Sequence, residues 1–180
     1  AFEGCSGLTS VTIPSGVVSI GAHAFDGCGE LMSVTVPPSV TNIGLSAFDR
    51  TPFYVNQPEG MVVLGAGVLY AYKGRCPSSV TIPSCVMSIG NGAFRNCREL
   101  TSVTMTSNVT SIGVGAFRGC SGLQEITIPS SVTKIGEYAF SGCSSLREIT
   151  IPSSVTEIGN FAFRDCSSLQ EIHVDINNPV

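Results

Sequence analysis

The chain has 180 residues and a formal net charge of −4, with 43% apolar residues but only 12% charged residues. This composition excludes a charge-rich disordered chain and a coiled coil. The sequence also lacks the cluster of lysine and arginine that is typical of a nucleic-acid-binding protein. No apolar run reaches the ~18 residues that a membrane helix needs, so we expect no membrane insertion in this segment.

A repeat of constant period runs along the sequence, and its period is the interval from Phe2 to Phe25. Phenylalanine preceded by alanine recurs at this interval with one gap of two periods, and cysteine follows three residues later in most copies. The markers are Phe2, Phe25, Phe48, Phe94, Phe117, Phe140 and Phe163. A fixed period of this length is the signature of a solenoid, in which stacked coils share one core. We therefore predict one domain over residues 1–180 with about eight coils.

One period indicates how each coil is built. Residues 126–128 alternate between apolar and polar, as a strand does, and residues 132–135 can form a second short extended segment. Gly136 suits a bend with positive φ. The stretch 137–143 is too short for an isolated helix, so we expect a single α or 3₁₀ turn held by Phe140. The prediction is an α/β repeat solenoid, predominantly β, with one parallel sheet on one face and short turns opposite.

The recurring run Leu-x-x-Ile-Thr-Ile-Pro-Ser-Ser-Val-Thr-x-Ile-Gly-x-x-Ala-Phe-x-x-Cys resembles the BspA-like class of leucine-rich repeats, over nearly the whole chain. The resemblance implies a right-handed leucine-rich-repeat superhelix. It also implies a non-enzymatic protein at the surface of bacteria or unicellular eukaryotes that binds other proteins, often as an adhesin. The class has no catalytic residues to carry over, and we expect neither enzyme activity nor a cofactor.

The repeat is irregular over residues 49–78. Two apolar segments, 61–64 and 68–70, flank Gly65-Ala66-Gly67, which predicts a β-hairpin with a glycine-rich turn, interrupting the parallel sheet near residues 53–72. Two interpretations remain open for the aromatic residues here: they complete the core where Ala-Phe and Cys are missing, or they form a contact patch for a partner. The candidate contact residues are Tyr54, Tyr70 and Tyr72.

Six of the eight cysteines occupy one repeat position, beside phenylalanine and leucine. Their stacked side chains should point in parallel, which fits a disulfide poorly, so we expect buried thiols. Cys76 and Cys85 lie on either side of the expected strand 80–82, which should hold them apart. We therefore predict no disulfide. We also predict no metal site, because the sequence has no Cys-x-x-Cys and its two histidines are far apart.

The outward positions of the repeated strand change in character along the chain. They carry serine and threonine in the first coils and acidic residues in the last three. The candidate binding residues are Glu125, Glu148 and Glu171, with His173 beside them. Like charges stacked on neighbouring strands cost about 0.2–1 kcal/mol per pair, so this file of carboxylates could mark a site for a basic partner or a cation. The alternative is a solvated face compensated by Lys134 and Arg147.

Two functions therefore remain open. The first is a binding or adhesion module, extracellular or at the cell surface, that recognises a protein or peptide with a basic segment through the strand face, the irregular coil or both. The second is a structural spacer or assembly unit that displays other domains. Neither end of the repeat carries a polar cap, so we expect a segment of a longer protein. Asn108 begins an Asn-x-Thr sequon, a possible glycosylation site in a eukaryotic secreted protein.

Overall fold

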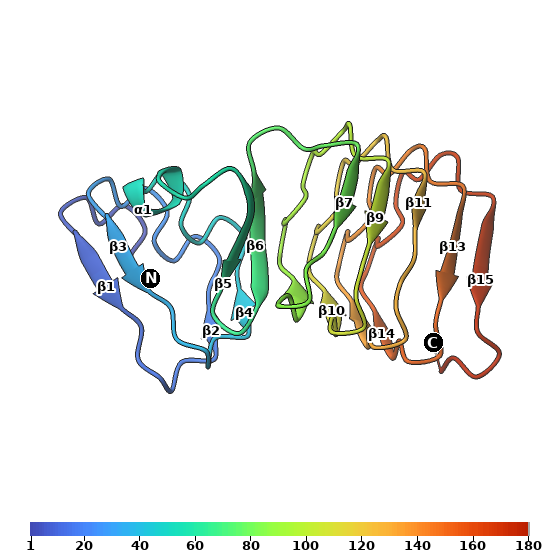
Figure 1. Ribbon diagram of the computed structural model, residues 1–180, viewed down its shortest axis with the longest axis horizontal. Helices are drawn as coiled ribbons and strands as arrows, with labels where there is room; N and C mark the ends of the chain where they lie inside the picture. Colours follow the sequence, from blue (N-terminus) through green and yellow to red (C-terminus); the bar gives the residue numbers. More distant parts are fainter. Residues whose placement is uncertain (180) are drawn as a thin grey trace.

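Short strands of successive coils stack along the long axis of the molecule, from the N-terminal coil to the C-terminal coil (Figure 1). The computed structural model describes residues 1–179 and is a predominantly β solenoid of about seven turns. The repeat period sets the register, since Ser10 pairs with Ser33 one period later. In the same way Ser102 Oγ donates to Ser79 Oγ at 3.1 Å, between residues 23 positions apart. Equivalent residues therefore stand next to each other, which confirms the solenoid.

One side of the solenoid, which we call the strand face, is formed by the Val/Ile-Thr segments. Its central residues point inward and their neighbours are exposed, because side chains alternate along a strand. The strands are β1 (Ser10–Thr12), β3 (Ser33–Thr35), β7 (Ser79–Thr81), β9 (Ser102–Thr104), β11 (Glu125–Ile126), β13 (Glu148–Ile151) and β15 (Glu171–Val174). Hydrogen bonds join β1 to β3, β9 to both β7 and β11, and β13 to β15.

The sheet of the strand face is less continuous than predicted. The interruption between β3 and β7 lies at the irregular coil, as expected. A second interruption separates β11 from β13: the two strands are neighbours, but among residues 1–179 no ladder pairing joins them. The strands on both sides of this second interruption nevertheless keep the same parallel direction along the face (Figure 1).

The second expected extended segment is also present and forms a second parallel ladder, which the irregular coil divides into two parts. In the regular coils it consists of two residues, with an isoleucine pointing inward. Lys134 pairs with Glu157 and Ile135 pairs with Ile158, again one repeat period apart. The strands are β2 (Ser19–Ile20), β4 (Asn42–Ile43), β8 (Ser88–Ile89), β10 (Ser111–Ile112), β12 (Lys134–Ile135) and β14 (Glu157–Ile158).

The irregular coil contains the predicted hairpin. It begins with the four-residue helix α1 (Pro52–Val55), which is capped by the side chain of Thr51, and continues with β5 (Gly60–Leu64) and β6 (Val68–Lys73), which pair in antiparallel fashion. The hairpin turn joins the second ladder: Ala66 N donates to Val40 O at 2.9 Å, and Gly67 O accepts from Met87 N at 2.8 Å. No helix among the described residues is long enough to cross a membrane.

The hairpin separates two buried apolar clusters, one on each side of it. Alternate residues of β6 face opposite clusters: Val68 and Tyr70 belong to the N-terminal cluster, whereas Leu69 belongs to the C-terminal cluster. In the C-terminal cluster the phenylalanines stack, with 5.4 Å between the ring centroids of Phe117 and Phe140. We call the coils on each side of the hairpin the N-terminal block and the C-terminal block. The hairpin completes the core of both blocks, in agreement with the interpretation that residues of the irregular coil fill the core.

The side opposite the strand face is not a helical turn, contrary to expectation. Each regular coil from the second onward has two residues with positive φ there, for example Tyr138 (54°) and Gly142 (76°) in the coil around Phe140. Such residues cannot belong to a right-handed helix. Local i→i−3 hydrogen bonds alternate with bonds between coils, for example from Phe140 N to Ala162 O at 2.8 Å. Backbone groups that a helix would pair internally are instead paired with the adjacent coil.

The expectation that Gly136 adopts a positive φ is wrong. A glycine is required at this position for a different reason. A Cβ atom at this position would lie 2.6 Å from the backbone carbon of Gly113 in the preceding coil. The glycine is needed because the backbones of two coils approach closely here.

Candidate functional site

The three glutamates of the last coils form a column on the strand face. Glu148 and Glu171 are paired residues of β13 and β15, and Glu125 occupies the same position on β11. All three side chains are exposed. We refer to Glu125, Glu148 and Glu171 as the acidic column.

A shallow hollow of about 420 Å³ follows the acidic column. Its other lining residues come from the preceding position of each coil, Gln124, Arg147 and Gln170. The hollow therefore offers carboxylates, amides and one guanidinium side by side, which can recognise polar groups of a peptide.

Charge compensation of the acidic column is incomplete. Glu171 Oε2 lies 3.1 Å from Nε2 of His173, so His173 belongs to the column's surroundings as expected. Lys134 lies on the second ladder and pairs with Glu157 at 2.9 Å, so it does not compensate the column. Among residues 1–179, no lysine, arginine or histidine nitrogen lies within ion-pair distance of Glu125 or Glu148.

The tyrosines of the irregular coil do not form one exposed patch. Tyr70 is 4% exposed, because its ring packs edge-on against Phe48 and against Tyr54, and burial raises the pKa of its hydroxyl well above the usual value. Tyr54 and Tyr72 are half-buried. Tyr72 takes the place of the missing phenylalanine: its N–H donates to Ala93 O at 2.7 Å, as the N–H of Phe94 donates to Ala116 O at 2.7 Å in the next coil.

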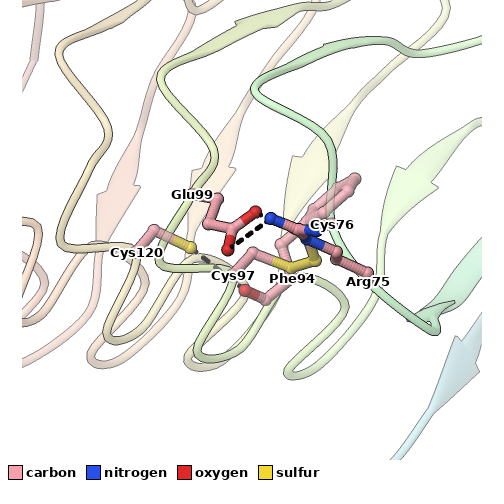
Figure 2. Close-up of a disulfide and its surroundings, with 6 residues drawn as sticks. All are labelled: Arg75, Cys76, Phe94, Cys97, Glu99 and Cys120. Atoms are coloured by element: carbon pink, nitrogen blue, oxygen red, sulfur yellow. Dashed lines mark hydrogen bonds and ion pairs between the residues drawn. A yellow bond between two sulfur atoms is a disulfide. The ribbon is translucent and has the colours of Figure 1, made fainter.

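The prediction of no disulfide is wrong for one pair. Figure 2 shows the disulfide between Cys76 and Cys97, whose Cα atoms lie 5.5 Å apart, with the ion pair of Arg75 and Glu99 beside it. Cys76 precedes Cys97 by 21 residues, less than one repeat period, so Cys76 is out of register with the ladder and its side chain need not point parallel to that of Cys97. That offset was the only signal in the sequence. Cys76 and Cys85 are not joined to each other, as expected.

The other ladder cysteines are free, and all except Cys5 are buried. Each buried thiol can donate to the phenylalanine carbonyl 26 residues earlier, as Cys120 does to Phe94 O at 3.0 Å (Figure 2). Burial raises the pKa of Cys120 to about 12 and also raises the pKa of Cys143 and Cys166. These thiols act as small buried side chains.

A cluster of possible metal ligands, which no spacing in the sequence indicates, lies near the N-terminus. Ligand atoms of Glu3, His23 and Asp26 lie within 4.8 Å of one another. The Asp26 carboxylate is already paired: Arg50 Nε and Nη2 donate to its two oxygens at 2.8 Å. This fork, with a further contact from His23, holds the pKa of Asp26 down at about 2. We interpret the cluster as a structural ion-pair network.

Asn108 is exposed in the loop between β9 and β10. Its amide nitrogen, the atom that a glycan would modify, donates to Ser84 O at 2.7 Å. Glycosylation of Asn108 would leave one hydrogen on this nitrogen, so this bond between two coils could be kept only through that hydrogen.

A family model described as the BspA type leucine rich repeat region matches six copies over residues 1–57 and 69–179. The chain belongs to this family. The gap between the two matched ranges, residues 58–68, lies in the irregular coil and contains β5 and the hairpin turn. No curated protein is significantly similar to this BspA-type chain.

Solved structures of other leucine-rich repeat proteins are similar to this BspA-type solenoid. A leucine-rich cell surface protein from Faecalibacterium prausnitzii is 29% identical with a TM-score of 0.58, and the match covers 97% of this chain and 62% of that protein. A leucine-rich repeat protein from Bacteroides ovatus is 30% identical with a TM-score of 0.54, with 97% and 45% covered. The chain thus spans less than two thirds of either. The pneumococcal vaccine antigen PcpA, 18% identical with a TM-score of 0.54 over 96% of this chain and 59% of that protein, shares the fold.

Proposed function

We propose that this chain is a non-enzymatic protein-binding module, extracellular or at the cell surface, and that its acidic column receives a basic segment of a partner protein. The observation that carries the proposal is the stacking of Glu125, Glu148 and Glu171 on neighbouring coils, two of them without an ion pair among the described residues. BspA-type repeats form a scaffold of a non-enzymatic type, which supports binding rather than catalysis.

The energetics favour a basic partner. Like charges that face each other on adjacent strands destabilise the sheet by about 0.2–1 kcal/mol per pair, and a bound cationic group would remove this repulsion. Coils spaced by ~4.8 Å place the three carboxylates within about 10 Å of one another. A cluster of two or three lysine or arginine side chains on one extended segment matches this length.

Two observations support the location. The disulfide of Cys76 and Cys97 requires an oxidising environment to persist, as outside the cell. One similar protein of known structure is described as a cell surface protein.

The test uses a labelled peptide of alternating lysine and serine, with a second peptide in which glutamine replaces lysine. Stopped-flow association with the intact chain should show a fast, salt-sensitive rate for the lysine peptide only. Replacement of all three column glutamates by glutamine should lower that rate and its dependence on salt. The matched control replaces Glu30, Glu59 and Glu137, which are exposed and lie outside the strand-face strands.

If both triple variants lower the rate equally, the effect comes from net charge and the acidic column is not the site. If the lysine peptide does not bind at all, the structural spacer is the better interpretation of this solenoid.

A further inference from the structure

A pocket of about 220 Å³ opens at the irregular coil, on the side opposite the strand face. Its lining includes Ser46 and Asp49 from the coil before the irregular one, Gly92 and Arg95 from the coil after it, and Tyr72 from β6 between them. Regular coils stack without such a space, because their turns are bonded directly to each other. The pocket exists because β6 replaces one row of turns.

Two opposite charges line the pocket. The half-buried carboxylate of Asp49 accepts a hydrogen bond from the Tyr70 hydroxyl at 3.2 Å, and within residues 1–179 it has no ion pair. Arg95 is exposed and, over the same residues, is in no ion pair either. A ligand must therefore offer donors to Asp49 and acceptors to Arg95, while the summed charge of the pair favours a neutral molecule.

Tyrosine rings supply the apolar part of the pocket. The Tyr54 ring meets Tyr70 edge-on with 5.7 Å between centroids, and the Tyr72 ring packs against Phe94 at 5.8 Å. Both rings are fixed by this packing, but neither hydroxyl has a hydrogen bond among the described residues. Burial raises the pKa of Tyr54, so its hydroxyl keeps its proton and can donate to a ligand.

Asn91 holds the wall of the pocket rather than serving as a ligand group. Its Nδ2 donates to Ile43 O at 2.8 Å, and its Oδ1 accepts from Val114 N at 2.8 Å. The amide therefore ties the coil before the irregular one to the coils after it, which fixes the width of the pocket.

The size and chemistry of this space select one class of ligand. A volume of about 220 Å³ is below the roughly 300–1,000 Å³ of pockets for drug-sized molecules, so a single small ring is the largest group that fits. Neighbouring hydroxyl groups can donate to a carboxylate and accept from a guanidinium at the same time. We propose that this pocket binds one pyranose ring of a carbohydrate, with hydroxyls on Asp49 and Arg95 and its C–H face against a tyrosine.

This proposal is independent of the acidic column, which lies on other coils. Its test is titration of the intact chain with methyl glycosides of glucose, galactose, mannose and N-acetylglucosamine, followed by saturation-transfer NMR and calorimetry. At least one glycoside should bind with a dissociation constant of about 1 mM. A methyl glycoside has its anomeric oxygen blocked, as in a glycan, so a parallel titration with the free sugars separates a glycan unit from a free monosaccharide.

The variant Arg95→Ala should weaken binding about tenfold, because a hydrogen bond to a charged group is lost, and Tyr54→Phe should weaken it while keeping the ring. The matched control is Arg118→Ala, at the same repeat position one coil later and outside the pocket, which should leave the affinity unchanged. The proposal is overturned if none of the sugars binds, or if Arg95→Ala and Arg118→Ala have equal effects.

Discussion

The hydroxyl oxygen of Tyr70 accepts a hydrogen bond from the backbone N–H of Phe48 at 3.0 Å. In the regular coils this N–H donates to an alanine carbonyl of the next coil, as Phe25 N does to Ala47 O at 2.8 Å. The irregular coil has no carbonyl in that place, so a tyrosine side chain takes over its role and donates its own proton to Asp49. The irregular coil thus preserves the hydrogen bonding of the coil before it.

Tyr70→Phe removes this acceptor and leaves a buried N–H without a partner. We expect a loss of about 1–3 kcal/mol in the free energy of unfolding, measured by urea denaturation. The control is Tyr72→Phe, since the Tyr72 hydroxyl makes no hydrogen bond with any described residue. Equal losses in the two variants would show that the Tyr70 hydroxyl does not replace the carbonyl.

Loss of the disulfide should destabilise the chain. Cys76 and Cys97 enclose a loop with a sequence separation of 21 residues, for which the chain-entropy model gives about 3 kcal/mol. Cys76→Ser should therefore lower the free energy of unfolding by roughly this amount, whereas Cys85→Ser, at an exposed free cysteine, should change it little. A Cys76→Ser variant as stable as Cys85→Ser would contradict the prediction.

The free thiols should react at two very different rates. Cys5 and Cys85 are exposed, whereas Cys28, Cys120, Cys143 and Cys166 are buried. The thiolate is the reactive form, and burial raises the pKa of Cys120, Cys143 and Cys166. Because all four buried thiols are also shielded from the reagent, iodoacetamide should label Cys5 and Cys85 quickly and the other four only after unfolding. Mass spectrometry of the labelled peptides checks this order. Rapid labelling of Cys120 in the native chain would show that the core opens locally.

Gly136→Ala should be strongly destabilising, although alanine normally favours ordered structure. The added Cβ would lie 2.6 Å from the backbone of Gly113, so two coils would have to separate. We expect a loss of about 1–3 kcal/mol, measured by thermal or urea unfolding. The control is Gly7→Ala, where a Cβ would meet no atom within 4 Å. A neutral Gly136→Ala variant would mean that the coils are not packed as closely as the structure shows.

Asp26 should make stability depend on pH under acidic conditions. Arg50 and then His23 lower its pKa from 3.8 to about 2 in the folded chain. A carboxyl with a depressed pKa stabilises the fold above its unfolded pKa and loses this contribution as the pH falls through the folded pKa. The difference in unfolding free energy between the native chain and Asp26→Asn should therefore be constant above pH ~5 and shrink between about pH 4 and 2. A difference that is independent of pH would contradict the ion-pair network.

The sequence predicted those features that one period contains. The apolar alternation of residues 126–128 and the extended segment at 132–135 were enough to place both ladders, and the repeat period determined which residues pair. The segment opposite the strand face is predicted to be a helical turn if one coil is considered alone, because a short segment can then pair its backbone groups only within itself. Its hydrogen bonds go to the next coil instead, and Tyr138 adopts a positive φ that its side chain does not favour in isolation.

The candidate site was predictable where it follows the repeat and not elsewhere. Glu148 and Glu171 stack because they are one repeat period apart. Cys76 and Cys97 depart from the period, so their contact depends on the path of the irregular coil, as do the walls of the pocket between Asp49 and Arg95. The period carries no information about that path.

The alternation of β6 has a consequence for how this protein can vary. Because Val68 and Leu69 face different clusters, the apolar core on each side packs against its own surface of the hairpin. Whole coils could therefore be gained or lost at either end of the solenoid without altering the packing on the other side of the hairpin. A lineage could lengthen the block that carries the acidic column, and so change the reach of the molecule, while the pocket at the irregular coil kept its shape.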